Sequence, residues 1–417
     1  EKAIEIDPNY ANAHNNLGIT FKELGELQKS KTCYEKAIEI YPNYVNAHNN
    51  LGTIFIKLRE LQKAKICYKK AIEIDPTHAN SHANLGAIFI KLEEPQKAKN
   101  CYEKAIEIDP NNINTHNNLG VLFVELAEYQ KAITCFEKVI EIDPNYANGH
   151  NNLGSTFKGL GKMQKAISCY EKAIEINPSY ADAYNNLGNV LKELGEQQKT
   201  ISCYEKAIEI NPNYADAQNN LGVISSELGE IEKAIKYYEK AIEINPNHAN
   251  AQNNLGVIFI ESRKFQKAKS CYEKAIKINP NFLNAYINLG NTFKELGEVE
   301  KAIKCYEKAI KIDPNKANAY INLGITLYEI KEFQKAKSCY EKAIQIRPGD
   351  LNALNGLLKS SYKTDNQSIL FKELDSRIKE GKMNAVIGSV CSRAEVKYGI
   401  KKENPFCNDP LNYVLKT

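Results

Sequence analysis

A stretch of 34 residues is copied ten times, without insertion or deletion, between Ala11 and Asp350. One copy reads ADAYNNLGNVLKELGEQQKTISCYEKAIEINPNY, from Ala181 to Tyr214, and the next copy begins directly with ADAQNNLGVI. Self-similarity at a fixed period of this size is typical of solenoid proteins, in which each unit buries its apolar face against its neighbours. The repeat therefore outweighs the roughly two or three globular domains that the length of the chain alone would suggest.

Each copy reads as two helices and two turns. In the copy quoted above, Asp182 is expected to cap a first helix that runs to about Leu194, and Gly195 is expected to end it. A second helix is expected from about Gln198 to Ile210, before a proline that cannot extend the helical hydrogen-bond ladder. The chain is therefore predicted to be all α-helical.

Small residues at fixed places predict close helix packing. A glycine in a helix interior costs about 1 kcal/mol relative to alanine, so its retention in every copy implies a neighbouring side chain that needs the space. On the second helix a small residue, usually alanine, is followed four residues later by an aromatic residue. The glycines are Gly18, Gly52, Gly86, Gly120, Gly154, Gly188, Gly222, Gly256, Gly290 and Gly324.

The Leu-Gly pair, the small residue, the aromatic, the later alanine and the closing proline, at this period, resemble the tetratricopeptide repeat (TPR). The resemblance covers residues 11–350 and implies a right-handed superhelical solenoid of ten helix-turn-helix repeats. Histidine, tyrosine or glutamine replaces the aromatic that often opens the family's first helix, which is interpreted as tolerated variation. Pro95 falls in an intra-repeat turn, and at the start of a helix it costs little.

Both ends of the chain depart from the repeat. Residues 1–10 look like the end of a truncated repeat and lack an initiating Met, so we expect sequence upstream. Residues 351–366 begin like a first helix but carry Leu358 where every repeat has glycine, so a capping helix is expected there. Residues 367–400 are predicted to form a short helical segment, and 401–417 a linker or the start of a missing domain.

The charge distribution argues against a nucleic-acid partner. The net charge of +4 arises entirely after Asp350, where 11 basic and 7 acidic residues occur, whereas the preceding residues hold 44 of each sign. Phosphate binding needs clustered Lys and Arg, which a neutral array does not supply. No run of about 18 apolar residues predicts a membrane span, and no secretory signal is visible.

The cysteines predict neither disulfides nor a metal site. Nine of the eleven occupy one repeat position. Equivalent positions of stacked helix pairs lie about 10 Å apart, whereas a disulfide needs Cα atoms within roughly 7 Å. Free thiols favour a reducing compartment, so a cytoplasmic location is predicted. Five histidines recur at the repeat period, too far apart to share a metal. No catalytic motif is present, so we expect no cofactor and no enzyme activity within this chain.

One repeated residue type has no evident folding role. An asparagine precedes Leu-Gly in every copy, although asparagine is a mediocre helix former. The same helix face carries Asp182 and Asn189, and Asp216 in the next copy. The ten asparagines are Asn16, Asn50, Asn84, Asn118, Asn152, Asn186, Asn220, Asn254, Asn288 and Asn322.

This ladder is similar to that of the repeat superhelix of the O-linked N-acetylglucosamine transferases, where asparagines hold the substrate backbone. The resemblance implies that the first helices line a concave groove, which would bind an extended peptide with little regard to its side chains. Duplication alone could also have copied the asparagines. A second binding mode of the family, a carboxylate clamp, needs Lys or Arg on these helices and is disfavoured. Partner identity and oligomeric state are not predicted.

An alternative function rests on the tail. Residues 404–414, NPFCNDPLNYV, resemble the segment that joins such repeats to an iron- and 2-oxoglutarate-dependent oxygenase-like domain. The chain would then be the substrate-recruiting arm of a larger enzyme, with a glycosyltransferase as the other candidate. Because no histidine follows His248, the iron site of such an oxygenase cannot lie within these residues. A His-x-Asp/Glu…His pattern beyond Thr417 would favour the oxygenase.

Overall fold

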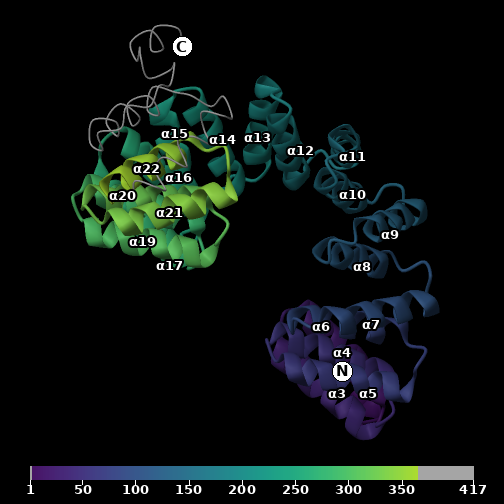
Figure 1. The fold of residues 1–417 in the computed structure, drawn as a ribbon. Coiled ribbons are helices and arrows are strands. Elements are labelled where there is room, and N and C mark those ends of the chain that lie inside the picture. The colour runs from purple at the N-terminus through teal and green to yellow at the C-terminus, as the bar shows by residue number, and fades with distance from the viewer. Residues whose placement is uncertain (1, 365–417) are drawn as a thin grey trace, which may run out of the picture. The chain divides into compact units, whose positions relative to one another are not determined.

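The structure is a computed structural model that describes residues 2–364. Within that range the chain folds into 22 α-helices and no strand, which confirms the all-α prediction (Figure 1). The segments predicted at 367–400 and 401–417 lie outside the described residues. In the ten repeats a first helix of 13 residues alternates with a second helix of 14.

The first helices are α2 (Ala11–Glu23), α4 (Val45–Lys57), α6 (Ala79–Lys91), α8 (Ile113–Glu125), α10 (Ala147–Gly159), α12 (Ala181–Glu193), α14 (Ala215–Glu227), α16 (Ala249–Glu261), α18 (Leu283–Glu295) and α20 (Ala317–Glu329). The second helices are α3 (Leu27–Ile40), α5 (Leu61–Ile74), α7 (Pro95–Ile108), α9 (Tyr129–Ile142), α11 (Met163–Ile176), α13 (Gln197–Ile210), α15 (Ile231–Ile244), α17 (Phe265–Ile278), α19 (Val299–Ile312) and α21 (Phe333–Ile346). They are preceded by α1 (Lys2–Ile6) and followed by α22 (Leu351–Lys363), whose role as a cap is still a prediction.

Two compact units divide the chain, one over Glu1–Pro212 and the other over Asn213–Thr417. Within each unit, a first helix packs against the second helix of its own repeat, and that second helix packs against the first helix of the next repeat. Each unit also has its own continuous hydrophobic core, running from Tyr34 to Leu191 in one and from Ala234 to Leu357 in the other. This is the nearest-neighbour packing of a solenoid.

The helix boundaries follow the sequence closely, with one correction. The end of α12 and both ends of α13 lie within a residue of the predicted bounds, and Pro95 opens α7 as expected. Asp182, however, does not cap α12, because the N-cap is Tyr180. A hydrogen bond of 3.1 Å from the Tyr180 amide to the Asn177 carbonyl closes the preceding turn, so the helix starts directly after Tyr180. Asp182 lies inside the first turn instead, where a carboxylate still interacts favourably with the helix dipole.

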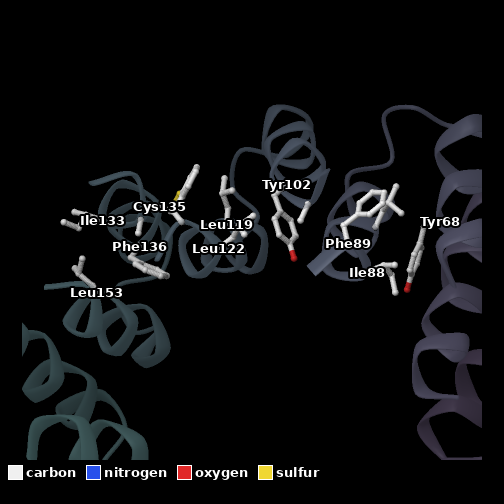
Figure 2. Close-up of a cluster of buried hydrophobic side chains, with 14 of the residues drawn as sticks. Tyr68, Ile88, Phe89, Tyr102, Leu119, Leu122, Ile133, Cys135, Phe136 and Leu153 are labelled. Carbon is white, nitrogen blue, oxygen red and sulfur yellow. The ribbon is translucent and has the colours of Figure 1, made fainter. Parts of the chain in front are cut away.

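The neighbour that requires the mid-helix glycine is the aromatic ring of the same repeat. A Cβ atom on Gly188 would lie 2.7 Å from Cε1 of Tyr204, whose side chain is completely buried. The corresponding distance is between 2.5 and 2.8 Å in all ten repeats. Figure 2 shows three of these rings, Tyr68, Tyr102 and Phe136, within one row of buried side chains. The glycine thus lets the ring lie flat against the first-helix backbone, which the sequence predicted only as a need for space.

The turn between the helices of a repeat has a fixed left-handed residue. Glycine occupies it in five repeats, for example Gly195 with φ +78°. In the other five the residue is Arg59, Glu93, Ala127, Arg263 or Lys331, with φ between 53° and 66°. A residue with a Cβ atom in this conformation costs roughly 1–2 kcal/mol, so the packing of the two helices, and not the turn residue, determines the turn.

We predict that Gly188→Ala loosens the pair α12–α13. Alanine removes the propensity penalty of about 1 kcal/mol, but overpacking against Tyr204 costs about 1–3 kcal/mol. Amide hydrogen exchange of α12 and α13 should therefore accelerate. In a Tyr204→Leu background the same change should become neutral or stabilising, because the ring is absent. Equal effects of Gly188→Ala in both backgrounds would show that the ring does not require the glycine.

Candidate functional site

The repeated asparagines form a hydrogen-bonded ladder between adjacent repeats. In most repeats, Nδ2 of the asparagine before Leu-Gly donates to Oδ1 of an asparagine 35 residues earlier, which stands one position before the equivalent asparagine of the preceding repeat. The bonds are Asn50 to Asn15 (3.1 Å), Asn84 to Asn49 (3.0 Å), Asn152 to Asn117 (2.9 Å), Asn186 to Asn151 (3.0 Å), Asn254 to Asn219 (3.1 Å) and Asn288 to Asn253 (3.2 Å). We call the first-helix surface that carries Asn16 and its nine equivalents the ladder face.

These bonds give the asparagines a structural role that the sequence did not reveal. The acceptors are largely buried: Asn151 and Asn253 are only 6% and 8% exposed. A buried carbonyl that loses its donor is destabilising by about 1–3 kcal/mol. The Asn-Asn pair, present in seven copies, was the available signal, but the two side chains meet only after neighbouring repeats have packed.

The ladder bond leaves binding capacity unused. A carboxamide has two N–H donors and a carbonyl acceptor. Asn186 donates one N–H to Asn151 and is only partly buried, as are the other bonded members of the ladder. A second N–H therefore remains on each side chain. In Asn152, Asn220 and Asn254 the carbonyl also accepts a longer bond of 3.4 Å from the preceding asparagine.

The other three predicted binding residues are placed differently. Asn189 accepts a 2.8 Å hydrogen bond from the Tyr204 hydroxyl, so it holds the buried ring of its own repeat. Asp216 lies 3.1 Å from Nε2 of His248, the last residue of the same repeat and the N-cap of α16, and this hydrogen bond lowers the pKa of Asp216. Asp182 is exposed. Asn189 and Asp216 are therefore engaged in packing contacts, and Asp182 is accessible.

The ladder is interrupted where its acceptor is missing. Ala83 stands where Asn117 and its equivalents stand, so Asn118 has no partner among the described residues and is exposed. Ile287 causes the same loss for Asn322, which instead donates to Asn291 at 2.9 Å. The residue equivalent to Asn291 beside Asn118 is Ala87, which offers no acceptor. Asn16, at the start of the array, is also exposed.

The histidines hold turns, and no metal-binding cluster occurs in residues 2–364. Nε2 of His14, His48, His82, His116 and His150 lies 2.9–3.0 Å from a proline carbonyl oxygen six residues earlier. This bond ties the first helix to the preceding turn and explains why histidine is tolerated there. The part of the chain that the structure describes has no group of three His, Cys, Asp or Glu residues placed to hold a metal ion.

The repeated thiols are protonated and packed. Each of the nine described cysteines is free and at least partly buried. Burial raises the pKa of seven of them, including Cys67 and Cys135, to about 11. The thiolate is the reactive form, so these residues act as small apolar side chains. Also within residues 2–364, no helix is both long and apolar enough to cross a bilayer.

Comparison with known families agrees with the repeat pattern. A profile described as tetratricopeptide repeat matches residues 11–44, 45–78, 79–112, 113–146, 181–214, 215–248, 249–282 and 317–350. A second profile of that description matches 135–168 and 271–304, and one described as TPR repeat matches 157–195 and 290–331. The chain belongs to the tetratricopeptide repeat family. TPR arrays are typically non-catalytic and mediate protein–protein interaction.

Three solved structures illustrate what the chain is similar to. Pseudomonas aeruginosa pilF is 22% identical, with 50% of this chain and 95% of that chain covered and a TM-score of 0.45. The APC/C hetero-tetramer Cut9-Hcn1 is 14% identical, covering 84% and 96%, with a TM-score of 0.48. MamA is 32% identical, covering 40% and 96%, with a TM-score of 0.35. No curated protein sequence matches the chain.

We predict that the ladder bonds stabilise the TPR array measurably. Asn186→Ala should destabilise its repeat pair by about 0.5–1.5 kcal/mol relative to Asn118→Ala, because only Asn186 loses a hydrogen bond. Both substitutions have the same helix-propensity gain, so their difference reports the bond. Amide exchange of α12 and α8 measures the two effects. Identical changes at the two positions would contradict the structural role.

We also predict that the repeat thiols resist labelling in the folded TPR array. At pH 8 a thiol with a pKa near 11 is ionised in about one molecule per thousand. A variant with Cys391→Ser and Cys407→Ser, the two cysteines outside the described residues, should react slowly with a disulfide reagent when folded. The same variant should react at all nine thiols in urea. Rapid labelling of a thiol in the folded protein would contradict the packing role.

Proposed function

We propose that this TPR array binds an extended segment of a partner protein along its ladder face and holds the backbone of that segment with the repeated asparagines. The observation that carries the proposal is the spare N–H that each bonded asparagine retains after its ladder bond, on a side chain that is only partly buried. The ladder bond restricts the carboxamide to one orientation, which lowers the entropy lost on binding.

The spacing of the asparagines also suits an extended chain. Adjacent repeats stack at about 10 Å, and an extended peptide advances about 3.3 Å per residue. One asparagine would therefore meet the backbone at roughly every third residue. Because backbone groups are common to all sequences, such contacts select for an extended conformation more than for particular side chains. The proposed partner is a protein, in keeping with the neutral charge of the repeats.

The alternative, a substrate-recruiting arm of a larger enzyme, depends on residues 404–414, which lie outside the described residues. In this alternative the partner segment binds to the same ladder face and is then presented to a catalytic domain.

The test separates binding by the carboxamide from its structural bond. Asn84→Ala, Asn152→Ala and Asn186→Ala together remove three side chains of the ladder face within one unit. The matched control is Asn49→Ala, Asn117→Ala and Asn151→Ala, which breaks the same three inter-repeat bonds but keeps the ladder-face carboxamides. Peptides for the measurement come from a random dodecapeptide library selected on the parent protein.

We predict that the first triple variant binds the selected peptides about 10-fold or more weakly, since three hydrogen bonds are lost. The control variant should bind within about 3-fold of the parent. Methylation of single peptide backbone nitrogens should also weaken binding. Failure to select any peptide, or equal loss in both variants, would contradict the proposal.

A further inference from the structure

The interruption of the ladder at Asn118 coincides with a pocket. The pocket has a volume of about 250 Å³ and lies between α6, α7 and α8. Its lining residues are Ala87, Ile90, Lys91, Tyr102, Asn118, Val121, Leu122 and Glu125. Most of the wall is apolar, and the volume is smaller than the roughly 300–1,000 Å³ of small-molecule sites. A single large side chain is the occupant that fits.

Two polar groups of this pocket lack partners. Asn118 has none because of Ala83, as described above. Tyr102 is 2% exposed, and its hydroxyl forms no hydrogen bond with any described residue. In four repeats the residue equivalent to Ala87 is polar and contacts this hydroxyl, as Thr53 contacts Tyr68 at 3.2 Å and Ser155 contacts Tyr170 at 3.1 Å, whereas the others have an aliphatic residue there. Burial raises the pKa of Tyr102 to about 12, so the group is a neutral hydroxyl.

Figure 2 shows the position of this ring. Tyr102 lies between Leu122 and Phe89, and its hydroxyl is at the end away from the helix that carries it. Two alanines of one helix, Ala83 and Ala87, thus leave a carboxamide and a hydroxyl unsatisfied in the same pocket. Because both residues line the pocket, a ligand bound there can form hydrogen bonds with the carboxamide of Asn118 and the hydroxyl of Tyr102.

The charges beside the pocket also differ from the rest of the array. At the last position of the first helix, seven repeats carry glutamate, but the two repeats before Asn118 carry Lys57 and Lys91. Elsewhere a lysine of one repeat pairs with this glutamate of the next, as in Lys158–Glu193 (3.1 Å) and Lys294–Glu329 (2.7 Å). Lys57 and Lys91 are exposed and form no ion pair with the described residues, and the positions before them are Ile56 and Ile90.

We infer that this pocket is a specificity site for an internal peptide segment that carries a large aliphatic side chain with acidic residues beside it. The aliphatic side chain enters between Ile90 and Val121, and its backbone bonds to Asn118. The acidic residues lie toward Lys57 and Lys91, away from Glu125 on the opposite rim. Since one repeat of about 10 Å spans about three extended residues, the acids fall within three positions of the aliphatic residue. This inference rests on the proposed function.

The test uses three synthetic dodecapeptides on a Ser/Thr background. The first has a central leucine and two aspartates within three residues on one side, the second replaces the leucine with alanine, and the third replaces the aspartates with lysines. The proteins are the full chain, Ala83→Asn, the pair Lys57→Glu and Lys91→Glu, and the matched pair Lys172→Glu and Lys206→Glu on exposed second-helix positions. Ala83→Asn restores the residue found in most repeats, so it should fold and stabilise α8.

We predict that the parent binds the leucine–aspartate peptide about 10-fold more tightly than the alanine peptide, from burial of the aliphatic side chain. Ala83→Asn should weaken binding of the leucine–aspartate peptide by about 3- to 10-fold, because one of the two free N–H groups of Asn118 then bonds to the introduced side chain and only the other remains for the peptide. The double variant Lys57→Glu and Lys91→Glu should bind the lysine peptide more tightly than the leucine–aspartate peptide. The control variant Lys172→Glu and Lys206→Glu should keep the parent's preference for the leucine–aspartate peptide.

Three outcomes would overturn the inference. Equal binding of all three peptides by the parent would remove the pocket as a specificity site while leaving backbone binding intact. An unchanged affinity of Ala83→Asn, with its stabilisation of α8 confirmed by amide exchange, would remove Asn118 from the site. Failure of the parent to bind any of the peptides, or any selected from the random library, would contradict the proposed function as well.

Discussion

The contact between an aromatic ring and a glycine backbone is the interaction on which every repeat depends. It brings the first and second helices so close that a Cβ atom at the glycine position, as at Gly188, would overlap the ring of Tyr204. Because the contact recurs at the same place in all ten repeats, each repeat presents the same surfaces to its neighbours. The left-handed turn follows from this packing, since five repeats adopt it without glycine.

The asparagine ladder depends on that regular packing. A bond such as Asn186 to Asn151 joins residues 35 positions apart and can form only when two repeats are stacked in register. Structural and binding roles are therefore compatible in one side chain, since one N–H serves the array and the other remains available.

The structural features that depend on residues of a single repeat were predicted well from the sequence. The helix bounds, the role of Pro95 and the space above Gly188 all depend on residues fewer than 34 positions apart, for which helix propensity and turn chemistry suffice. Asp182 was misplaced as a cap because its residue type is typical of caps, whereas the preceding turn, closed at Tyr180, sets the helix start. The partner of Asn186 was missed because it lies in the adjacent repeat, and a single copy carries no information on how copies stack. The partner of Asp216 was missed because His248 closes the same copy and comes close only when α16 packs beside α14.

The paired alanines at positions 83 and 87 have a consequence for any ligand of a repetitive surface. When identical sites lie in a row, a bound chain can shift by one repeat without losing contacts. The complex then has many alignments of equal binding free energy. An irregular repeat removes that degeneracy. In the proposed complex, the unpaired Asn118 and the pocket beside it would make one alignment of the segment distinct from its neighbours. In an array built by duplication, two alanines on one helix would then be enough to fix the register of a partner.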